Sequence, residues 1–259
     1  MADSEYSTIL FEDQGPLARL TLNRPDKRNP IGPATCGELV HALARIKQTT
    51  SSRVVVLTGA GSAFSAGGDL AAIQSNPAGG PPVASLVDLF VAMHELGKPI
   101  IAMVNGPALA GGLGLMVACD LVVASEAAAF GTTEIAVGLW PMMITAEITR
   151  SVGRKTTLEM MLTGRKLSAA EALAAGLVNK VVPAAELEGE TLKLALALAE
   201  KSPAATALGL KAFYRSQDME FEPQLRYLQA ELGRVLALED AAEGIAAFLG
   251  KRAPVWKGK

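Results

Sequence analysis

Two uncharged runs constrain the fold of this chain more than any other feature of its sequence. VVVLTG (54–59) is a continuous apolar run rich in β-branched residues, and PIIAMVNG (99–106) is a second apolar run. Strands that are buried on both faces have this composition, and they occur mainly in parallel sheets covered by helices. The segments 32–48 and 83–97 show amphipathic helical patterns, so strand and helix alternate along the chain. The sequence therefore predicts an α/β architecture.

The remaining elements follow from shorter patterns. Further strands are expected at 7–15, 17–23, 121–125 and 177–183. Further helices are expected from 70 onward, at 156–162 and at 168–175. Ser168 is followed three residues later by Glu171, which is the pattern of a capping box at a helix start. The stretch SNPAGGPP (75–82) predicts an irregular excursion between two helical segments.

The length and composition allow one large core with an appendage. Half of the 259 residues are hydrophobic, which is enough for a sizeable core. From Ala184 to about Leu249 the pattern is almost wholly helical and rich in Ala, Leu and Glu. We expect a core over 1–200 and a helical C-terminal subdomain over 201–259, with the boundary near Pro203.

The segment 99–119 is long enough and apolar enough to span a bilayer, so a membrane helix is an alternative interpretation. Pro107 and four glycines interrupt it, and Asn105-Gly106-Pro107 is a turn signal. It also lacks the flanking basic cluster and the aromatic belt of a membrane span. A strand, a turn and a short buried helix fit better, and no membrane partner is expected.

Composition narrows the function classes further. The net charge of -2 implies no broad basic surface, so nucleic acid is not expected as a partner. The N-terminus MADSEYSTIL lacks the basic-then-apolar order of a signal peptide, which favours a cytoplasmic protein. Cys36 and Cys119 have no metal-ligand spacing and are expected as buried thiols, and neither His41 nor His94 belongs to a metal motif. We therefore expect no metal.

Two stretches share one design, which is a buried strand, then a loop of small residues, then a helix start. They are VVVLTGAGSAFSAGGDL (54–70) and PIIAMVNGPALAGGLGL (99–115). Small residues let a backbone approach a ligand closely, and the free amides of a helix start suit an anion or a carbonyl that becomes one. Tight helix–strand packing is the alternative interpretation, but two loops with the same layout favour a binding site.

Better-known glycine loops do not fit these stretches. The string GxxxxGK[ST] of a phosphate-binding loop is absent. A dinucleotide-binding GxGxxG pattern fails because Val117 stands where its last glycine belongs. The GxSxG elbow of serine hydrolases is absent, and Ser65 has no obvious histidine partner.

The same stretches carry a resemblance to a known family. FSAGGDL (64–70) and NGPALAGGLGL (105–115), followed by CDLVVAS and FGTTEIAVGL, are similar to the crotonase, or enoyl-CoA hydratase/isomerase, superfamily. LNRPDKRNPI (22–31) and GRKLSAAEALAAGLVNKVV (164–182) match it as well, in the same order along the chain. The resemblance implies a spiral of ββα repeats with a C-terminal helical region used for trimerisation. A homotrimer, or a hexamer of two stacked trimers, is therefore expected.

The resemblance also implies the chemistry. Members bind acyl-CoA thioesters and stabilise enolate-like intermediates with two backbone amides, which map to Ala66 and Gly111, and coenzyme A enters only as part of the substrate. Each such donor contributes about 3 kcal/mol of transition-state stabilisation. Glu134 matches a family glutamate that transfers protons, and burial is expected to raise its pKa. The position of the second glutamate found in many hydratases is Gly114, which has no proton to give.

One carboxylate favours isomerisation of the double bond over hydration. A single glutamate can take a proton from C2 of a 3-enoyl-CoA and return it at C4. Syn hydration of a 2-enoyl-CoA by one glutamate is the close alternative. An acyl-CoA-binding protein with little turnover is an alternative of another class. The acyl chain length and the pathway do not follow from the sequence.

Further residues are expected at the substrate. The turn 24–29 carries Lys27 and Arg28, whose charges suit the phosphates of coenzyme A. Asp69 is expected to cap and order its own loop more than to touch the substrate. Trp140, Met142 and Met143 either line an apolar acyl pocket or pack beneath it. The full set of expected substrate contacts is Arg24, Lys27, Arg28, Ser65, Gly67, Gly68, Asp69, Leu70, Gly114, Trp140, Met142, Phe248 and Lys257.

Overall fold

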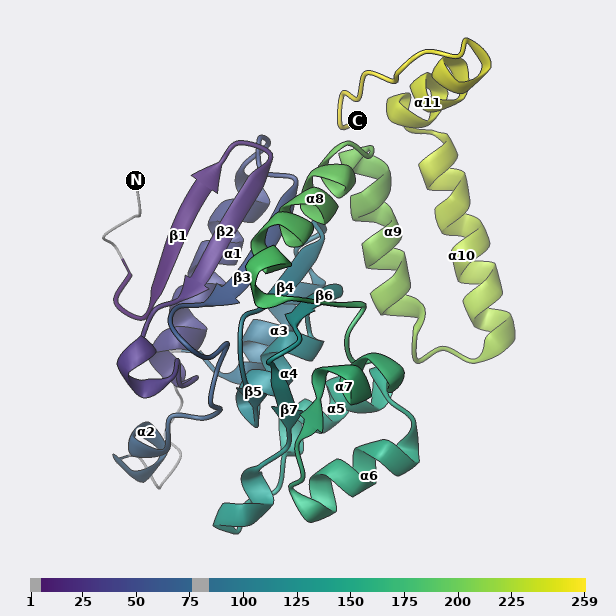
Figure 1. Cartoon of the computed structure of the whole chain (residues 1–259). Helices are drawn as coiled ribbons and strands as arrows, with labels where there is room; N and C mark the ends of the chain where they lie inside the picture. Colours follow the sequence, from purple (N-terminus) through teal and green to yellow (C-terminus); the bar gives the residue numbers. More distant parts are fainter. Residues whose placement is uncertain (1–5, 76–83) are drawn as a thin grey trace.

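The computed structural model describes residues 6–75 and 84–259 and contains two sheets (Figure 1). The larger sheet has six strands in the order β1-β2-β3-β4-β6-β9. β1 and β2 are antiparallel, and every other neighbouring pair in this sheet is parallel. Its strands are β1 (Ile9–Gln14), β2 (Leu17–Leu22), β3 (Val54–Gly59), β4 (Ile100–Val104), β6 (Leu121–Ser125) and β9 (Lys180–Val182).

Helices separate most of these strands, which confirms the expected α/β alternation. The α-helices are α1 (Pro33–Gln48), α2 (Leu70–Ser75), α3 (Leu86–His94), α4 (Gly111–Val117), α5 (Met142–Ser151), α6 (Arg154–Thr163), α7 (Ala169–Ala174), α8 (Leu187–Ala199), α9 (Pro203–Ser216), α10 (Phe221–Leu236) and α11 (Glu239–Leu249). Short 3₁₀ turns are η1 (Pro25–Lys27), η2 (Glu134–Val137) and η3 (Ala184–Glu186). The sequence pattern did not indicate α5. The irregular excursion expected at 75–82 lies, apart from Ser75 in α2, outside the described residues.

The core has two layers because the side chains of β3 alternate between the faces of the sheet. Val55 and Leu57 join the larger cluster, which includes buried residues of α1 and α3. Val54 and Val56 join the smaller cluster, which α8 covers on the opposite face. Every residue of β3 and β4 is buried. This confirms the interpretation of the two apolar runs as strands buried on both faces, and the run from 99 is no membrane span. Among the described residues, no helix has both the length and the apolarity needed to cross a bilayer.

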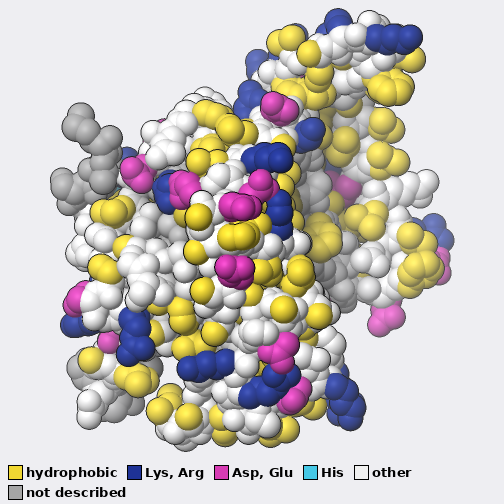
Figure 2. Space-filling model, in the orientation of Figure 1, with side chains coloured by type: hydrophobic (Ala, Val, Ile, Leu, Met, Phe, Trp, Pro, Cys, Tyr) yellow, Lys and Arg dark blue, Asp and Glu magenta, His cyan; other side chains and the backbone are white. Residues whose placement is uncertain are grey.

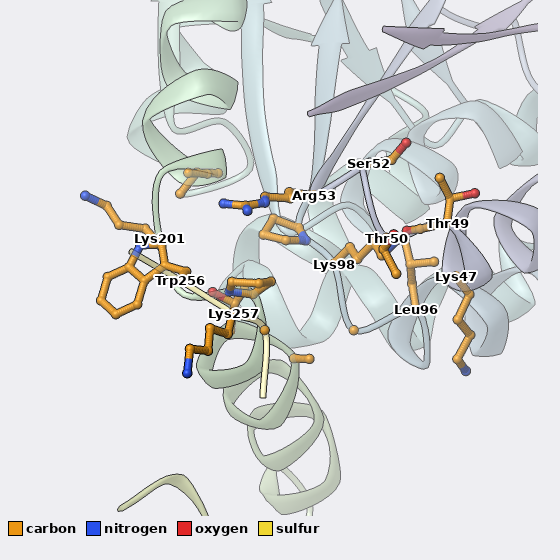
Figure 3. A pocket seen from close by; sticks show the side chains of 17 residues that line it. Lys47, Thr49, Thr50, Ser52, Arg53, Leu96, Lys98, Lys201, Trp256 and Lys257 are labelled. Atoms are coloured by element: carbon orange, nitrogen blue, oxygen red, sulfur yellow. Dashed lines mark hydrogen bonds between the residues drawn. The ribbon is translucent and has the colours of Figure 1, made fainter. Parts of the chain in front are cut away.

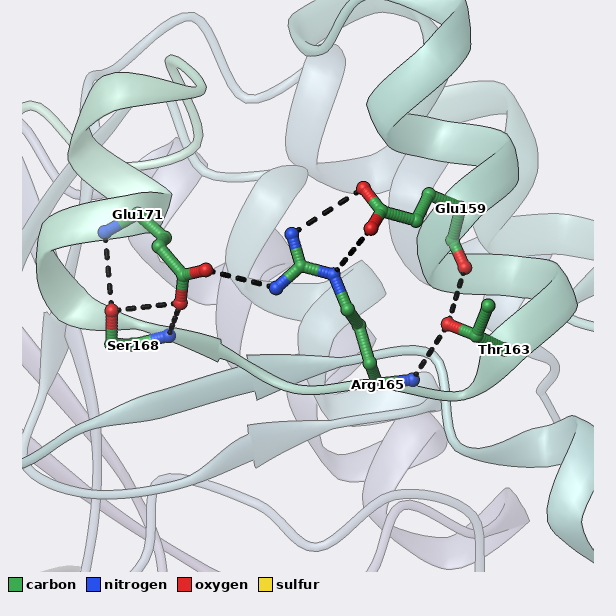
Figure 4. A network of polar contacts seen from close by, with 5 residues as sticks. All are labelled: Glu159, Thr163, Arg165, Ser168 and Glu171. Carbon is green, nitrogen blue, oxygen red and sulfur yellow. Dashed lines mark hydrogen bonds and ion pairs between the residues drawn. The ribbon is translucent and has the colours of Figure 1, made fainter.

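A second, three-stranded sheet consists of β5 (Ala108–Leu109), β7 (Ala129–Gly131) and β8 (Leu167–Ser168). Arg165 supports it by linking α6 to α7, as Figure 4 shows. Its guanidinium donates to Glu159 and to Glu171, each at 2.9 Å. Glu171 in turn accepts from the backbone N–H of Ser168 at 2.8 Å, which confirms the expected capping box at the start of α7.

Of the three C-terminal helices, α9 packs against α3, and Figure 1 shows α10 and α11 standing off from the remainder. The chain end returns toward the start of α9, because Asp240 accepts hydrogen bonds from the backbone N–H of Lys257 and from the hydroxyl of Ser202, at 2.7 and 2.6 Å. Hydrophobic side chains are visible along these helices in the space-filling view (Figure 2). The division of the chain into domains at residue 200 stays a prediction.

Candidate active site

The two glycine loops meet beyond the carboxyl ends of β3 and β4, in the middle of the larger sheet. β3 and β4 are parallel neighbours, so their carboxyl ends lie side by side. Beyond these ends the loops pair with each other, since Ser65 N donates to the carbonyl of Pro107 at 3.1 Å and Leu109 N to the carbonyl of Ser65 at 2.9 Å. The shared design of the two loops therefore corresponds to a shared place in the fold.

Two backbone amides without an acceptor among the described residues lie close together at this junction. Ile31 pairs with the residues on either side of Gly68, through Ile31 N to Gly67 O at 2.8 Å and Asp69 N to Ile31 O at 2.9 Å. The amide of Gly68 therefore points away from Ile31. Its nitrogen lies 3.7 Å from the position that a β-carbon on Gly111 would take. Among the described residues, no group accepts a hydrogen bond from the amide of Gly68 or Gly111.

The expectation for Ala66 needs revision. Its amide donates to the carbonyl of Arg28 at 2.8 Å, so it is not free to bind a substrate oxygen in this conformation. The sequence places Ala66 and Gly68 in the same loop, and only the pairing with residues 28–31 distinguishes their amides. The geometry favours Gly68 in place of Ala66 as the partner of Gly111.

The loops must be made of small residues because their backbones are in contact. A β-carbon on Gly112 would lie 2.5 Å from the β-carbon of Ser65. Gly67 has φ of +113°, and a β-carbon there would lie 2.8 Å from that of Ala110. Ser65 itself is fully buried and donates its hydroxyl to the carbonyl of Asn29 at 2.7 Å. Ser65 therefore ties the first glycine loop to Asn29, and its buried side chain is not accessible to a ligand.

Glu134 lies next to this junction because of the second sheet. β5 and β7 are parallel, with Leu109 opposite Gly131, and Ala110 N donates to the carbonyl of Gly131 at 2.7 Å. Gly111 and Glu134 follow these paired residues closely, so both leave the sheet at the same end. The Oε2 atom of Glu134 is buried and has no hydrogen-bond partner among the described residues. Burial raises the pKa of this carboxyl above its usual value, which agrees with the expected direction.

Gly114 has no room for an acidic side chain. A β-carbon there would lie 2.1 Å from Cγ2 of Ile144 and 3.3 Å from the ring of Phe90. Ile144 comes from α5, which packs against α4, and it is buried. The space beside Gly114 is thus filled by an apolar side chain of the neighbouring helix.

The turn at 24–29 is tied to the first glycine loop. Arg24 donates to Asp69 at 2.7 Å, and Asp69 accepts from Ala72 N at 3.2 Å. Asp69 therefore has the loop-ordering contacts that were expected of it, and its pKa is lowered chiefly by the hydrogen bond from Arg24. Lys27 and Arg28 are exposed on this turn, and Leu70, at the start of α2, is exposed as well.

Asn29 is a residue of this region whose importance the sequence pattern did not reveal. It is buried with φ of +55°, a left-handed conformation that asparagine tolerates. Its side-chain amide donates to the carbonyls of Ala60 and Ala63, both at 2.9 Å, and its side-chain oxygen accepts from Arg24 N. The position before Pro30 and the preference of asparagine for turns are the signals from which this could have been found.

The other expected substrate contacts divide into two groups. Trp140 is partly buried against the core, whereas Met142 is 68% exposed just beyond Glu134. Phe248 and Lys257 do not join the site within one chain. Phe248 is 83% exposed on α11, and Lys257 lines a hollow beside Arg53 and Pro99, at the opposite end of β3 and β4.

Cys36 and Cys119 are buried thiols, as expected. No cluster of potential metal ligands occurs among the residues that the structure describes.

Comparisons with known proteins identify the family of this chain. The sequence profile of a family described as enoyl-CoA hydratase/isomerase matches residues 12–259. The chain is 38% identical to a putative enoyl-CoA hydratase of Thermus thermophilus, over 93% of this chain and 98% of that protein. It is 34% identical to a probable mitochondrial enoyl-CoA hydratase of Dictyostelium discoideum, over 98% of this chain and 92% of that protein.

A solved structure of a family member has the same fold as this chain. The crystal structure of an enoyl-CoA hydratase of Mycobacterium smegmatis superposes with a TM-score of 0.92 at 34% identity, over 96% of this chain and 99% of that one. The expected crotonase fold is thereby confirmed. Because the family profile matches almost the whole chain and this solved structure superposes over nearly all of it, this chain belongs to the enoyl-CoA hydratase/isomerase (crotonase) family.

Proposed function

We propose that this enzyme moves a carbon–carbon double bond in an enoyl-CoA thioester, with Glu134 as its single proton-transfer group. The amides of Gly68 and Gly111 are proposed to hold the thioester oxygen. The observation that carries the preference for isomerisation is the packing at Gly114. Ile144 occupies the space that a second carboxylate needs, with its Cγ2 atom 2.1 Å from the position of a β-carbon on Gly114.

The chemistry requires one base and one oxyanion site. The carboxylate of Glu134 removes a proton from C2 of a 3-enoyl-CoA, and the electrons of the broken C–H bond move to the thioester oxygen. Two backbone N–H groups bind this oxygen as its negative charge grows, and they need no reorganisation because the loops already fix them. The protonated Glu134 then returns the proton at C4, and the double bond forms between C2 and C3. No atom is gained or lost.

Burial of Glu134 serves both steps of this cycle. The raised pKa makes the carboxylate a stronger base and keeps the carboxylic acid able to donate at C4. An unpaired buried Oε2 leaves one carboxyl oxygen for the substrate. Hydration uses the same group to activate water, but a second carboxylate to position that water has no room at Gly114.

The acyl group that we propose is apolar. Glu134 is followed by Val137 and Leu139 in and beyond η2 and by Met142 at the start of α5, and all three side chains are exposed. An apolar chain that covers these side chains removes apolar surface from water, whereas a carboxylated chain gains no such contact there. Lys27 and Arg28 are the proposed contacts of the coenzyme A phosphates.

A spectrophotometric assay tests the reaction directly. The enzyme is mixed with a 3-enoyl-CoA, and the absorbance of the conjugated 2-enoyl thioester is followed. We expect a rise that disappears in Glu134→Gln. Loss of absorbance from 2-enoyl-CoA, without a rise from 3-enoyl-CoA, would assign syn hydration instead.

The binding-only alternative needs a separate measurement. A saturated acyl-CoA is incubated with the enzyme in deuterated water, and deuterium uptake at C2 is followed by mass spectrometry. Uptake that depends on Glu134 supports proton transfer at the proposed site. Saturable binding without deuterium uptake and without turnover of either enoyl-CoA would make the protein an acyl-CoA binder.

A further inference from the structure

A cationic hollow lies at the end of the sheet opposite the candidate active site. It has a volume of about 310 Å³ and is lined by residues that precede β3 and β4, by the end of α1, by the start of α9 and by the chain end. Arg53 comes directly before β3, and Lys98 and Pro99 come directly before β4. The unpaired amides of Gly68 and Gly111 follow the carboxyl ends of the same strands. The hollow is therefore a separate place on the molecule.

The charges around this hollow are strongly one-sided. Five cationic side chains line it, and no Asp or Glu occurs among the described residues of its lining. The whole chain has slightly more acidic than basic residues, 26 against 24, so composition does not explain the bias. The five cations are Lys47, Arg53, Lys98, Lys201 and Lys257.

Two of these cations donate hydrogen bonds to backbone carbonyls at or near helix ends. Lys98 donates to the carbonyls of Ile46 and Thr49 at the end of α1, and Arg53 donates to the carbonyl of Ala199 at the end of α8. Their charges offset the negative ends of the two helices. Arg53 uses one nitrogen for this bond, so further donors of its guanidinium are left for a ligand.

The remaining cations are exposed. Lys257 pairs with Glu239 at 3.0 Å, so its charge is shared. The side chains of Lys47 and Lys201 form no hydrogen bond or ion pair with any described residue. These two ammonium groups lie on opposite sides of the hollow, and neither is offset by an ion pair with a described residue. Asp13, the carboxylate beside the lining residue Ser52, already accepts a hydrogen bond from the Ser52 hydroxyl at 3.1 Å.

An aromatic ring forms one wall. Trp256 is half-buried in the lining, and its indole N–H donates to the carbonyl of Glu200 at 2.7 Å. Asp240 fixes the adjacent backbone through Lys257 N and Gly258 N at 2.7 and 3.1 Å. Figure 3 shows Trp256 beside Lys201 and Lys257, with Arg53 between this group and Lys98. A flat apolar ring is thus held in a fixed place among cations.

We propose that this hollow binds a nucleoside diphosphate. The phosphates would bind at the guanidinium of Arg53, where charge-assisted hydrogen bonds are available, and Lys47 and Lys201 would attract them from the two sides of the hollow. The base would lie against the indole of Trp256, because a base presents a flat face to any aromatic ring. The volume is within the range of small-molecule sites. Free ADP and the ADP unit of coenzyme A present the same chemistry, and the test separates them.

Fluorescence of Trp256 provides a local readout. The chain has two tryptophans, so Trp140→Phe leaves Trp256 as the only one. Titration of this variant with ADP is expected to give saturable quenching that weakens with added salt. Adenosine and inorganic phosphate are expected to bind more weakly than ADP. Tighter binding of ADP than of coenzyme A identifies a free nucleotide as the ligand, and the reverse order identifies the nucleotide end of coenzyme A.

Two charge variants locate the binding. In the Trp140→Phe background, Lys47→Ala with Lys201→Ala is expected to weaken ADP binding about tenfold, because two positive charges that attract the phosphates are lost. Lys155→Ala with Lys193→Ala removes the same charge from exposed positions elsewhere and is expected to leave the affinity unchanged. Lys27→Ala with Arg28→Ala controls for ADP bound at the candidate active site and is also expected to leave the quenching unchanged.

The proposal fails if ADP does not quench Trp256, if adenosine alone binds as tightly as ADP, or if Lys47→Ala with Lys201→Ala binds as well as the parent. Thermal melting of each variant checks that it is folded. Because the readout is binding at Trp256 and not turnover, the result is independent of whether the enzyme isomerises or hydrates its substrate.

Discussion

At the scale of single residues, the most informative group is the carboxyl of Glu134. Its Oε2 atom is buried without a partner, and burial raises its pKa. Unsatisfied buried polar atoms are uncommon in folded proteins, because each one costs stability. A group held in this way beside two free amides is better explained by chemistry than by packing.

The substitution Glu134→Gln is expected to separate activity from stability. Loss of the proton-transfer group should reduce turnover by about 10² to 10⁴-fold. The variant should nevertheless melt at a higher temperature than the parent at neutral pH, because a buried carboxylate is replaced by an uncharged amide.

The pH dependence of this difference follows from the direction of the pKa shift. The folded state of the parent holds the Glu134 proton more tightly than the unfolded state. Its stability relative to the variant therefore falls as the pH rises from about 4.5 through the raised pKa. Below that range both states are protonated, and the two proteins should differ little. Thermal melts across the pH range test this, and a difference independent of pH would contradict it.

Whether Gly68 or Ala66 supplies the second N–H group of the oxyanion site is also decided at the scale of single residues. Replacement of one backbone amide by an ester through semisynthesis removes the N–H donor and weakens the preceding carbonyl as an acceptor, which affects the bonds from Ile31 N and Leu109 N in both variants alike. At Gly68 this change is expected to lower kcat by about 10² to 10³-fold, as for other oxyanion donors. At Ala66 it should mainly lower stability, because that amide donates to Arg28. Steady-state kinetics and melts of the two esters give the answer, and the opposite pattern would restore Ala66.

At the scale of elements, the contact between α4 and α5 decides how many carboxylates the site can hold. Ile144 projects against Gly114, and no pattern within α4 alone indicates this neighbour. Two substitutions test the contact by their effects on the free energy of unfolding.

Gly114→Ala is expected to destabilise the protein by about 1–3 kcal/mol, because the added methyl group overlaps Ile144. Helix propensity alone predicts the opposite sign, a gain of about 1 kcal/mol. Adding Ile144→Ala removes the nearest overlapping atom, Cγ2 of Ile144, so the double variant should be more stable than the sum of the single effects. Urea denaturation measures all four proteins, and additive effects would show that the two residues do not interact.

At the scale of the whole molecule, the C-terminal helices leave an apolar face without a partner in the single chain. Leu225 and Leu232 on α10 are 52% and 55% exposed, and Phe221, Leu228 and Leu236 continue the same face. A monomer rarely exposes so continuous an apolar patch. We propose that copies of this chain cover it in a trimer or hexamer, as the family resemblance implies.

The substitutions Leu225→Asp and Leu232→Asp together are expected to dissociate the assembly, because two carboxylates would be buried in an apolar interface. Analytical ultracentrifugation should show a multiple of the monomer mass for the parent and mainly monomer for the variant. Charge added on the opposite side of the same helix, as Ala230→Asp, should leave the mass unchanged, because Ala230 is exposed and faces away from Leu225 and Leu232. A monomeric parent would refute the proposal.

The compartment of the protein also belongs to this scale. One of the relatives that this chain resembles is named as mitochondrial. A cytoplasmic location therefore stays a prediction.

The sequence by itself determined the architecture, the family and the stretches from which the candidate site is built. Continuous apolar runs led to β3 and β4, because strands buried on both faces need apolar residues at every position. The motif around Glu134 and the two glycine loops identified the family. Each of these features lies within one short stretch of the sequence, so it can be recognised without knowledge of the fold.

The tertiary structure alone decided which atoms are free and which spaces are filled. The pairing with residues 28–31 leaves the amide of Gly68 free and engages that of Ala66. α5 places Ile144 against Gly114, and the fold places Lys257 at the opposite end of the sheet from Glu134. Each outcome depends on contacts between segments distant in sequence, and such contacts are set by how helices and strands pack rather than by the residues next to them in the chain.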